Sequence, residues 1–187
     1  MKQFLAILLC VVIPVVAFAA TEPPTQPPVN TTPATKMEAF KPKAGSVMTV
    51  GFDELGEIKR ISVDVREIRE ARGTSVRGLV IHVTESQYRE GKSFVDADEI
   101  RELLKGFDAL LEVRENPTQF KNFEVRYTTR GELELTAFND SKGNVSYAVK
   151  AGRTIGARAY LTLTDMQNLR ILFDSASQKL TALESPK

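Results

Sequence analysis

Alternation of apolar and polar residues predicts strands in the first half of the chain. The segment 58–65 reads IKRISVDV, in which the apolar residues from Ile61 onward share one face and the polar residues from Arg60 onward share the other. A second run, Val76–Thr84, is apolar on both faces at its centre and predicts a central strand. Shorter strands are predicted at Ser46–Val50 and Lys92–Val95.

The apolar period changes to that of a helix at Asp96. Asp96 and Glu99 form a capping-box-like start, and Asn116-Pro117 provides a stop, because proline disfavours helical geometry in the residue before it. We therefore predict a helix from Ala97 to Val113. Its buried face should carry Ile100, Leu103, Leu104, Phe107, Leu110 and Leu111.

The second half repeats this order of strands followed by a helix. Alternating residues flank a turn at Arg130-Gly131, which predicts a β-hairpin over 123–138. Two further strands are predicted at Val145–Lys150 and Ile155–Leu163, and Thr164 is expected to cap a C-terminal helix. The apolar face of that helix should contain Met166, Leu169, Leu172, Phe173, Ala176 and Leu180.

The predicted order of strands, helix, strands and helix indicates an α+β fold. Links between neighbouring strands are short, which favours antiparallel pairing over a parallel, doubly wound sheet. We expect an antiparallel meander sheet with the two amphipathic helices packed on one face. Residues 45–187 should form a single domain, because no Pro- or Gly-rich break divides them and their number suffices for an ordinary core.

The N-terminus predicts export. An apolar run over residues 4–19 ends in Ala17-Phe18-Ala19, the small-x-small pattern of a signal-peptidase site. We therefore predict a signal peptide at 1–19, cleaved before Ala20, and a periplasmic or secreted product. The run is shorter than the roughly 20 apolar residues that a membrane span needs, so we expect no integral membrane span after cleavage.

The next segment, residues 20–44, is rich in proline and poor in large apolar residues. Such a segment cannot bury enough surface to offset the entropy of ordering the chain. We expect a disordered linker with a polyproline-like extension, which either holds the domain away from a surface or simply follows the cleavage site.

Composition removes several kinds of chemistry. The only cysteine, Cys10, lies in the predicted signal peptide, so the mature chain should have no disulfide, thiolate nucleophile or Cys-ligated zinc. An exported domain without disulfides favours a bacterial origin. Lys and Arg number 25 against 24 Asp and Glu, and the loss of Lys2 leaves a formal charge of zero, which argues against a nucleic-acid partner.

Few residues suit catalysis or cofactor binding. His82 is the only histidine and lies within the most apolar strand, where a half-buried structural role is expected. Acidic residues at the start of the first predicted helix are explained by capping and the helix dipole rather than by metal binding. The glycines are scattered, unlike those of a phosphate-binding loop, and no serine lies in a nucleophile elbow. We expect no metal, no cofactor and no catalytic residue.

One weak recognition surface is suggested by four residues. Tyr127 and Arg130 belong to a predicted turn, and later strands contribute Tyr147 and Tyr160; alternatively the tyrosines fill the edge of the core. Our leading hypothesis is a non-enzymatic domain that binds an unknown protein, envelope component or ligand through its sheet or edge loops. The alternative is a carboxylate-based hydrolase acting on envelope or extracellular glycans, which needs two acids converging in a cleft.

Overall fold

The computed structural model describes residues 33–71, 73–114, 116–153 and 156–184. The predicted signal peptide, its cleavage site and the first part of the predicted linker lie outside the described residues. Among the helices of the described part, none combines the length and hydropathy needed to cross a membrane.

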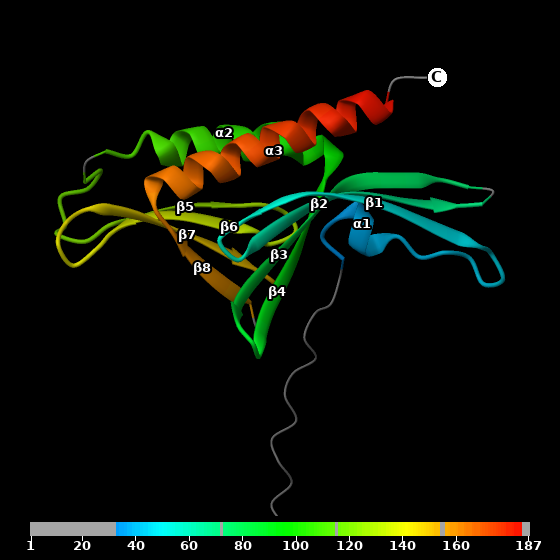
Figure 1. Cartoon of the computed structure of the whole chain (residues 1–187), viewed down its shortest axis with the longest axis horizontal. Helices are drawn as coiled ribbons and strands as arrows, with labels where there is room; N and C mark the ends of the chain where they lie inside the picture. Colours follow the sequence, from blue (N-terminus) through cyan, green and yellow to red (C-terminus); the bar gives the residue numbers. More distant parts are fainter. Residues whose placement is uncertain (1–32, 72, 115, 154–155, 185–187) are drawn as a thin grey trace, which may run out of the picture. The chain divides into compact units, whose positions relative to one another are not determined.

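The strands of the described chain form two antiparallel sheets of four strands each (Figure 1). In both sheets, strands that follow one another in sequence lie next to one another. The first sheet is composed of β1 (Met48–Ile58), β2 (Ile61–Glu70), β3 (Ser75–Ser86) and β4 (Arg89–Asp96). The second is composed of β5 (Glu124–Thr128), β6 (Glu134–Asn139), β7 (Val145–Ala151) and β8 (Ala157–Leu161).

The two long helices pack against each other and against both sheets. A short 3-10 turn, η1 (Ala97–Glu99), leads into α2 (Ile100–Leu111), which contacts β5 and β6. The C-terminal helix, α3 (Leu163–Glu184), contacts α2, β1 and β2, and Figure 1 shows both helices on the same side of the strands. A one-turn helix, α1 (Lys36–Ala39), precedes β1 and contacts β3 and β4.

The mixed α+β class predicted from the sequence is confirmed, but the prediction of one sheet is wrong. After β4 the chain enters α2 and returns as β5, which pairs with β6 and not with β4. Instead, β4 meets the second sheet at Gly91, where an added Cβ would overlap the carbonyl oxygen of Ala151. Nearby, the Gly152 N–H donates to the Ser93 hydroxyl at 3.1 Å. The sheets therefore meet through close backbone contact without sharing a ladder.

The core lies on the helix-facing side of the sheets. On β2, Ile61, Val63 and Val65 are buried while the residues between them face the opposite side, as the alternation predicts. The predicted central strand, β3, lies between β2 and β4. Phe107 of α2 and Phe173 of α3 pack with ring centroids 5.1 Å apart, which joins the two helices over the core.

The last part of the predicted linker is folded onto the domain. The Thr35 hydroxyl accepts the Glu38 N–H at 3.1 Å and so caps α1, and Met37 is only 3% exposed. The N–H groups of Lys36 and Met37 donate to the buried carboxylate of Asp96 at 2.8 and 3.2 Å. The structure therefore differs from the expected extended spacer over this stretch, because capping and one buried methionine stabilise a helical turn.

The long helices begin differently from the sequence prediction. Asp96 makes no side-chain cap on η1, because its carboxylate binds α1 instead. The capping residue of α3 is Thr162 and not Thr164. The Thr162 hydroxyl accepts the Asp165 N–H at 3.2 Å, and the Asp165 carboxylate accepts the Thr162 N–H at 3.0 Å. This reciprocal pair is a capping box placed two residues earlier than expected.

Candidate functional site

The structure does not bring the four predicted binding residues together. Tyr147 lies on β7 and is 1% exposed, so its ring belongs to the core. Tyr127 lies on β5, is half-buried, and packs against Gly106 of α2. Burial raises the pKa of both hydroxyl groups, which therefore stay protonated near neutral pH.

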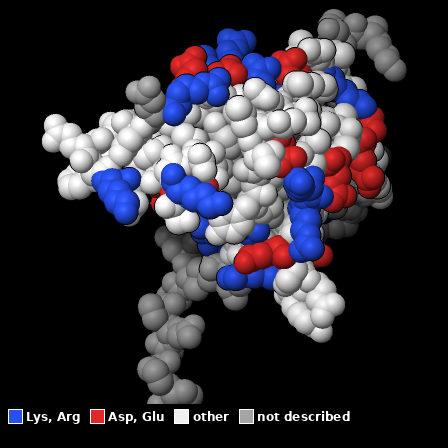
Figure 2. Space-filling view, turned by 60° about the vertical axis from the view of Figure 1, so that its left-hand side comes forward, with Lys and Arg blue, Asp and Glu red and all other residues white. Residues whose placement is uncertain are grey.

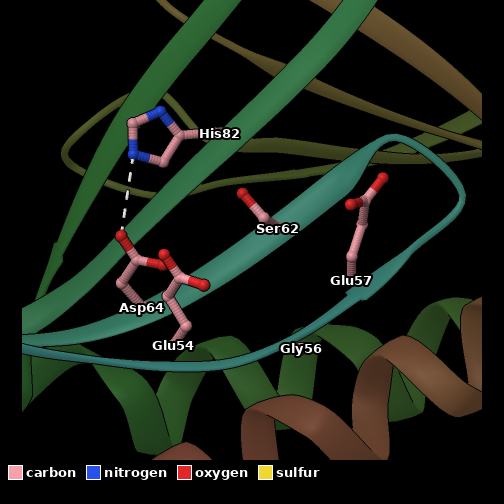
Figure 3. A pocket seen from close by; sticks show the side chains of 6 residues that line it. All are labelled: Glu54, Gly56, Glu57, Ser62, Asp64 and His82. Atoms are coloured by element: carbon pink, nitrogen blue, oxygen red, sulfur yellow. Dashed lines mark ion pairs between the residues drawn. The ribbon is translucent and has the colours of Figure 1, made fainter.

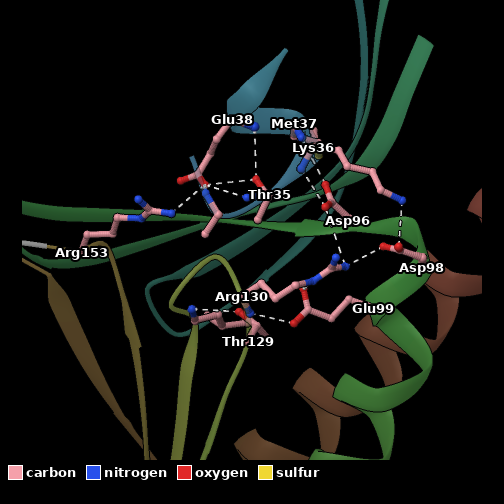
Figure 4. A network of polar contacts seen from close by, with 12 residues as sticks. Thr35, Lys36, Met37, Glu38, Asp96, Asp98, Glu99, Thr129, Arg130 and Arg153 are labelled. Atoms are coloured by element: carbon pink, nitrogen blue, oxygen red, sulfur yellow. Dashed lines mark hydrogen bonds and ion pairs between the residues drawn. The ribbon is translucent and has the colours of Figure 1, made fainter. Parts of the chain in front are cut away.

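Arg130 belongs to a polar network that joins α1 to the turn between β5 and β6 (Figure 4). Its backbone N–H and Nε donate to Glu99 at 2.7 and 3.2 Å, and its Nη2 donates to Asp98 at 2.6 Å. Asp98 also accepts from Lys36 Nζ at 2.8 Å. The carboxylate of Asp96, which holds the start of α1, lies 3.8 Å from the Arg130 guanidinium.

The charges of this network satisfy one another. Hydrogen bonds from Lys36 and Arg130 hold the pKa of Asp98 below its ordinary value, although desolvation opposes them. The hydrogen bond to Asp98 raises the pKa of Arg130 in turn. The Arg130 guanidinium is therefore already paired with carboxylates of the same chain, which favours a structural role for this residue.

Of the three predicted tyrosines, only Tyr160 is exposed. It lies on β8 between two buried residues, so it faces away from the helices, and it is 66% exposed. Phe138 of β6 forms an edge-to-face pair with it, with centroids 6.1 Å apart and ring planes at 73°. On β7, which lies between them, Ala148 is in register with Tyr160 and with Thr136, and Ser146 is in register with Phe138. The two rings therefore meet diagonally across β7, where the small side chains of Ala148 and Ser146 leave room for them.

A shallow cavity of about 250 Å³ opens beside this aromatic pair. Thr136 and Ala148, both nearly buried, belong to its lining, together with polar groups from β5, β6 and β8. We name this set the Tyr160 surface. Its residues are Asn122, Phe123, Glu124, Thr136, Phe138, Asn139, Ala148, Arg158 and Tyr160.

Hydrogen bonds hold polar residues of the Tyr160 surface in place. The side-chain oxygen of Asn139 accepts the Phe123 N–H at 2.8 Å, which fixes the segment leading into β5. The Arg158 guanidinium lies 3.5 Å from Glu134, and its backbone N–H donates to the Glu85 carboxylate at 3.2 Å. These polar groups are therefore ordered before any ligand arrives.

A second cavity, of about 460 Å³, adjoins the Tyr160 surface because both include Arg158 and Tyr160. The turn between β1 and β2 contributes Lys59 and Arg60, and the end of β3 contributes Glu85. The Arg60 guanidinium donates to the Glu85 carbonyl at 2.7 Å. Tyr160 therefore lies between two hollows. The smaller one is lined by one acid and one base, Glu124 and Arg158, and the larger one is lined by more basic than acidic residues.

Apolar side chains also line the edge strand β1. Met48, Val50 and Phe52 alternate on one face and are exposed. Because β1 pairs only with β2, its outer edge is open to backbone pairing. This edge is an apolar stripe, whereas the Tyr160 surface combines rings, hydrogen-bonding groups and a hollow. The Tyr160 surface is therefore the better candidate for a ligand site.

The lone histidine lies in a different pocket, on the first sheet (Figure 3). His82 Nε2 is 3.8 Å from Asp64, which also accepts from the Arg66 guanidinium at 3.2 Å. Burial and the neighbouring charge of Lys92 lower the pKa of His82 against the attraction of Asp64. The imidazole is therefore neutral at pH 7. The pocket is lined by Glu54, Gly56, Glu57, Ser62, Asp64 and His82.

Charge and ligand geometry place further limits on the described part of the chain. No group of three or more His, Cys, Asp or Glu side chains is arranged there to hold a metal ion. Figure 2 shows that acidic and basic side chains both occur on the face in view, separated by uncharged areas. Mixed charge of this kind offers no extended basic track for a nucleic-acid backbone on that face.

No known protein family, characterised protein or solved structure matches this chain. Its function is therefore inferred from its own sequence and surfaces.

Sequence reasoning identified Tyr160 but missed its partner Phe138. The signal is that both occupy positions on the strand face opposite the core, where an aromatic residue is unexpected. Their proximity depends on the pairing of β6, β7 and β8 and on the small residues Ala148 and Ser146 of β7. Neither the register nor this gap is encoded in the local pattern of a single strand.

Proposed function

We propose that this chain is an exported, non-enzymatic binding domain that holds its ligand at the Tyr160 surface. The observation that carries the proposal is the exposed ring of Tyr160, paired with Phe138 beside a hollow with ordered polar groups. Such a ring contributes a large contact area at a small cost in conformational entropy. The apolar run over residues 4–19 supports a periplasmic or secreted location.

The acid–base chemistry of the described residues also favours binding over catalysis. A general acid near neutral pH needs a carboxyl group with a raised pKa. Where the pKa of a described carboxyl group departs from its ordinary value, it is lowered. At Glu67, burial raises the pKa, but hydrogen bonds from Arg77 and Arg69 outweigh it.

A carboxylate-based hydrolase is the second candidate, because Glu54 and Asp64 are cross-strand neighbours that both line the His82 pocket. Glycoside hydrolysis needs two acids in distinct protonation states. Of the acids in this pocket only Asp64 is buried, and Arg66 already binds it. Release of reducing sugar from envelope polysaccharide that is lost in Asp64→Asn would support this candidate; absence of release would exclude it for that substrate.

The binding proposal is tested by retention of envelope material on the immobilised mature chain. Wild type, Tyr160→Ala and Tyr88→Ala are exposed to the same envelope extract of the producing organism. Tyr88 is the matched control, since its ring is 89% exposed and lies outside the Tyr160 surface. Both aromatic side chains are on the surface, so neither truncation should unfold the domain, which circular dichroism checks.

We expect wild type and Tyr88→Ala to retain the same material, and Tyr160→Ala to retain about tenfold less, as for the loss of a central aromatic anchor. Equal retention by Tyr160→Ala, or no specific retention by wild type, would contradict the proposal.

A further inference from the structure

We infer that the ligand of the Tyr160 surface is a saccharide chain that carries an acidic unit. This inference rests on the proposed function. The ring pair, the polar surround, the presence of two adjoining hollows and the charge of the second hollow each point to it.

The ring pair suits the apolar face of a pyranose. Carbon-bound hydrogens line the faces of such a sugar, while its hydroxyl groups point outward around the ring. Tyr160 and Phe138 meet at 73°, so they form a corner in which one ring is a platform and the other a wall. The short, buried side chains of Thr136 and Ala148 do not project beside this corner, which leaves room for a flat ring.

The polar groups around this corner match a ring of hydroxyls. The Asn122 amide both donates and accepts, the Glu124 carboxylate accepts, and the Arg158 guanidinium donates. A sugar hydroxyl is itself both donor and acceptor, so it can pair with any of these groups. Glu124 also binds Arg126, and Arg158 also binds Glu134, but an apolar peptide side chain would still remove water from these groups without offering a hydrogen bond, which is costly.

The two adjoining hollows indicate a ligand longer than one unit. Their volumes are about 250 and 460 Å³, and they meet at Arg158 and Tyr160. The smaller hollow is below the roughly 300–1,000 Å³ of typical small-molecule pockets, whereas the two together fall within that range. A chain that packs one unit on Tyr160 can therefore place its neighbours in both hollows.

The charge of the second hollow selects for an acidic unit. Lys59, Arg60 and Arg158 line it with a single acid, Glu85, and Arg158 also binds Glu134, which lies outside the lining. The ammonium group of Lys59 is 3.8 Å from Asp165 and its side chain is more than half exposed, so it can also contact a ligand. A sugar carboxylate, as in a uronic acid unit, would meet net positive charge at this end of the surface.

The experiment separates saccharide from protein as the retained ligand. The probe is an envelope extract digested exhaustively with protease, its polysaccharides labelled with a fluorophore at their reducing ends. A second sample has its sugar carboxylates chemically reduced to alcohols. Both are passed over wild type, Tyr160→Ala, Lys59→Ala and the Tyr88→Ala control, and the undigested extract is run in parallel.

We expect wild type and Tyr88→Ala to retain the labelled saccharide, and Tyr160→Ala to retain about tenfold less. Carboxyl reduction and Lys59→Ala should each weaken retention. If Tyr160-dependent retention occurs only with undigested extract, the ligand is a protein, so this inference fails while the proposed function stands. If neither extract shows it, both fail. Equal retention of reduced and native saccharide would overturn the acidic unit.

Discussion

Small side chains decide where the large ones of this molecule can lie. Ala148 and Ser146 permit Phe138 and Tyr160 to meet diagonally over β7. On the other side of the second sheet, Gly106 of α2 permits the Tyr127 ring to lie directly beneath the helix. In both places small neighbouring residues leave room for the aromatic ring, so adding one methyl group at Gly106 tests the packing.

Gly106→Ala should destabilise the fold. The new Cβ would lie 2.6–2.9 Å from three atoms at the backbone end of the Tyr127 ring, which cannot swing aside without moving β5. Overpacking of this kind costs about 1–3 kcal/mol, and the better helix propensity of alanine returns roughly 1 kcal/mol. Urea unfolding measures the net loss. Gly51→Ala is the control, because nothing lies within 4 Å of its added Cβ, and a comparable loss there would contradict the packing argument.

His82 should make stability depend on pH between about 7.5 and 5.5. Its pKa is lowered in the folded chain, so the unfolded chain binds a proton more readily as the pH falls through 6.5. The free energy of unfolding should therefore fall on acidification in this window, and His82→Gln should flatten the fall. Denaturant titrations at several pH values measure it. Identical slopes for both proteins would show that the imidazole is not desolvated.

At the scale of helices and strands, the sequence pattern predicts the periods well and the ends poorly. The predicted strand over 76–84 and the predicted helix from Ala97 lie within β3 and across η1 and α2. The ends differ because capping depends on competition between polar groups. The Asp96 carboxylate accepts the Lys36 N–H of α1 instead of capping η1, and this contact spans 60 positions of sequence, so no local pattern contains it.

Thr162→Ala should cost about 1 kcal/mol of stability, whereas Thr164→Ala should cost little, because only Thr162 accepts a helix N–H. Both hydroxyl groups belong to exposed residues, so the pair is matched. Thermal unfolding of the two variants measures the difference. A larger loss in Thr164→Ala would restore the cap expected from the sequence.

At the scale of the whole molecule, the two sheets depend on contacts between segments far apart in sequence. The alternation of β strands and helices predicts the α+β class, but it does not say whether β5 joins β4 or starts a new sheet. Gly91 of β4 meets the backbone of Ala151, which leaves no room for a side chain at position 91. The hollow beside the candidate site shares this property, since Lys59 follows β1 of the first sheet and Tyr160 belongs to β8 of the second.

A chain that begins at Gly45, the expected domain boundary, should be less stable than one that begins at Pro33. Removing α1 exposes the surface under Met37 and leaves the buried Asp96 carboxylate without its two N–H donors. We expect a loss of at least about 2 kcal/mol, combining burial of one methionine and the lost hydrogen bonds. Denaturant unfolding of both chains measures it. Met37→Ala in the longer chain should show a smaller loss of the same sign, and equal stability of the two chains would mean that α1 adds nothing.

The hydrogen bonds from α1 to Asp96 also provide a local probe of whether the domain is folded. The N–H groups of Lys36 and Met37 are bound to a carboxylate that is 1% exposed. In deuterated water these two amides should exchange slowly only while the sheets on which α1 rests are intact. Faster exchange of these two amides would therefore report local opening of β3 or β4 while the rest of the domain is still folded.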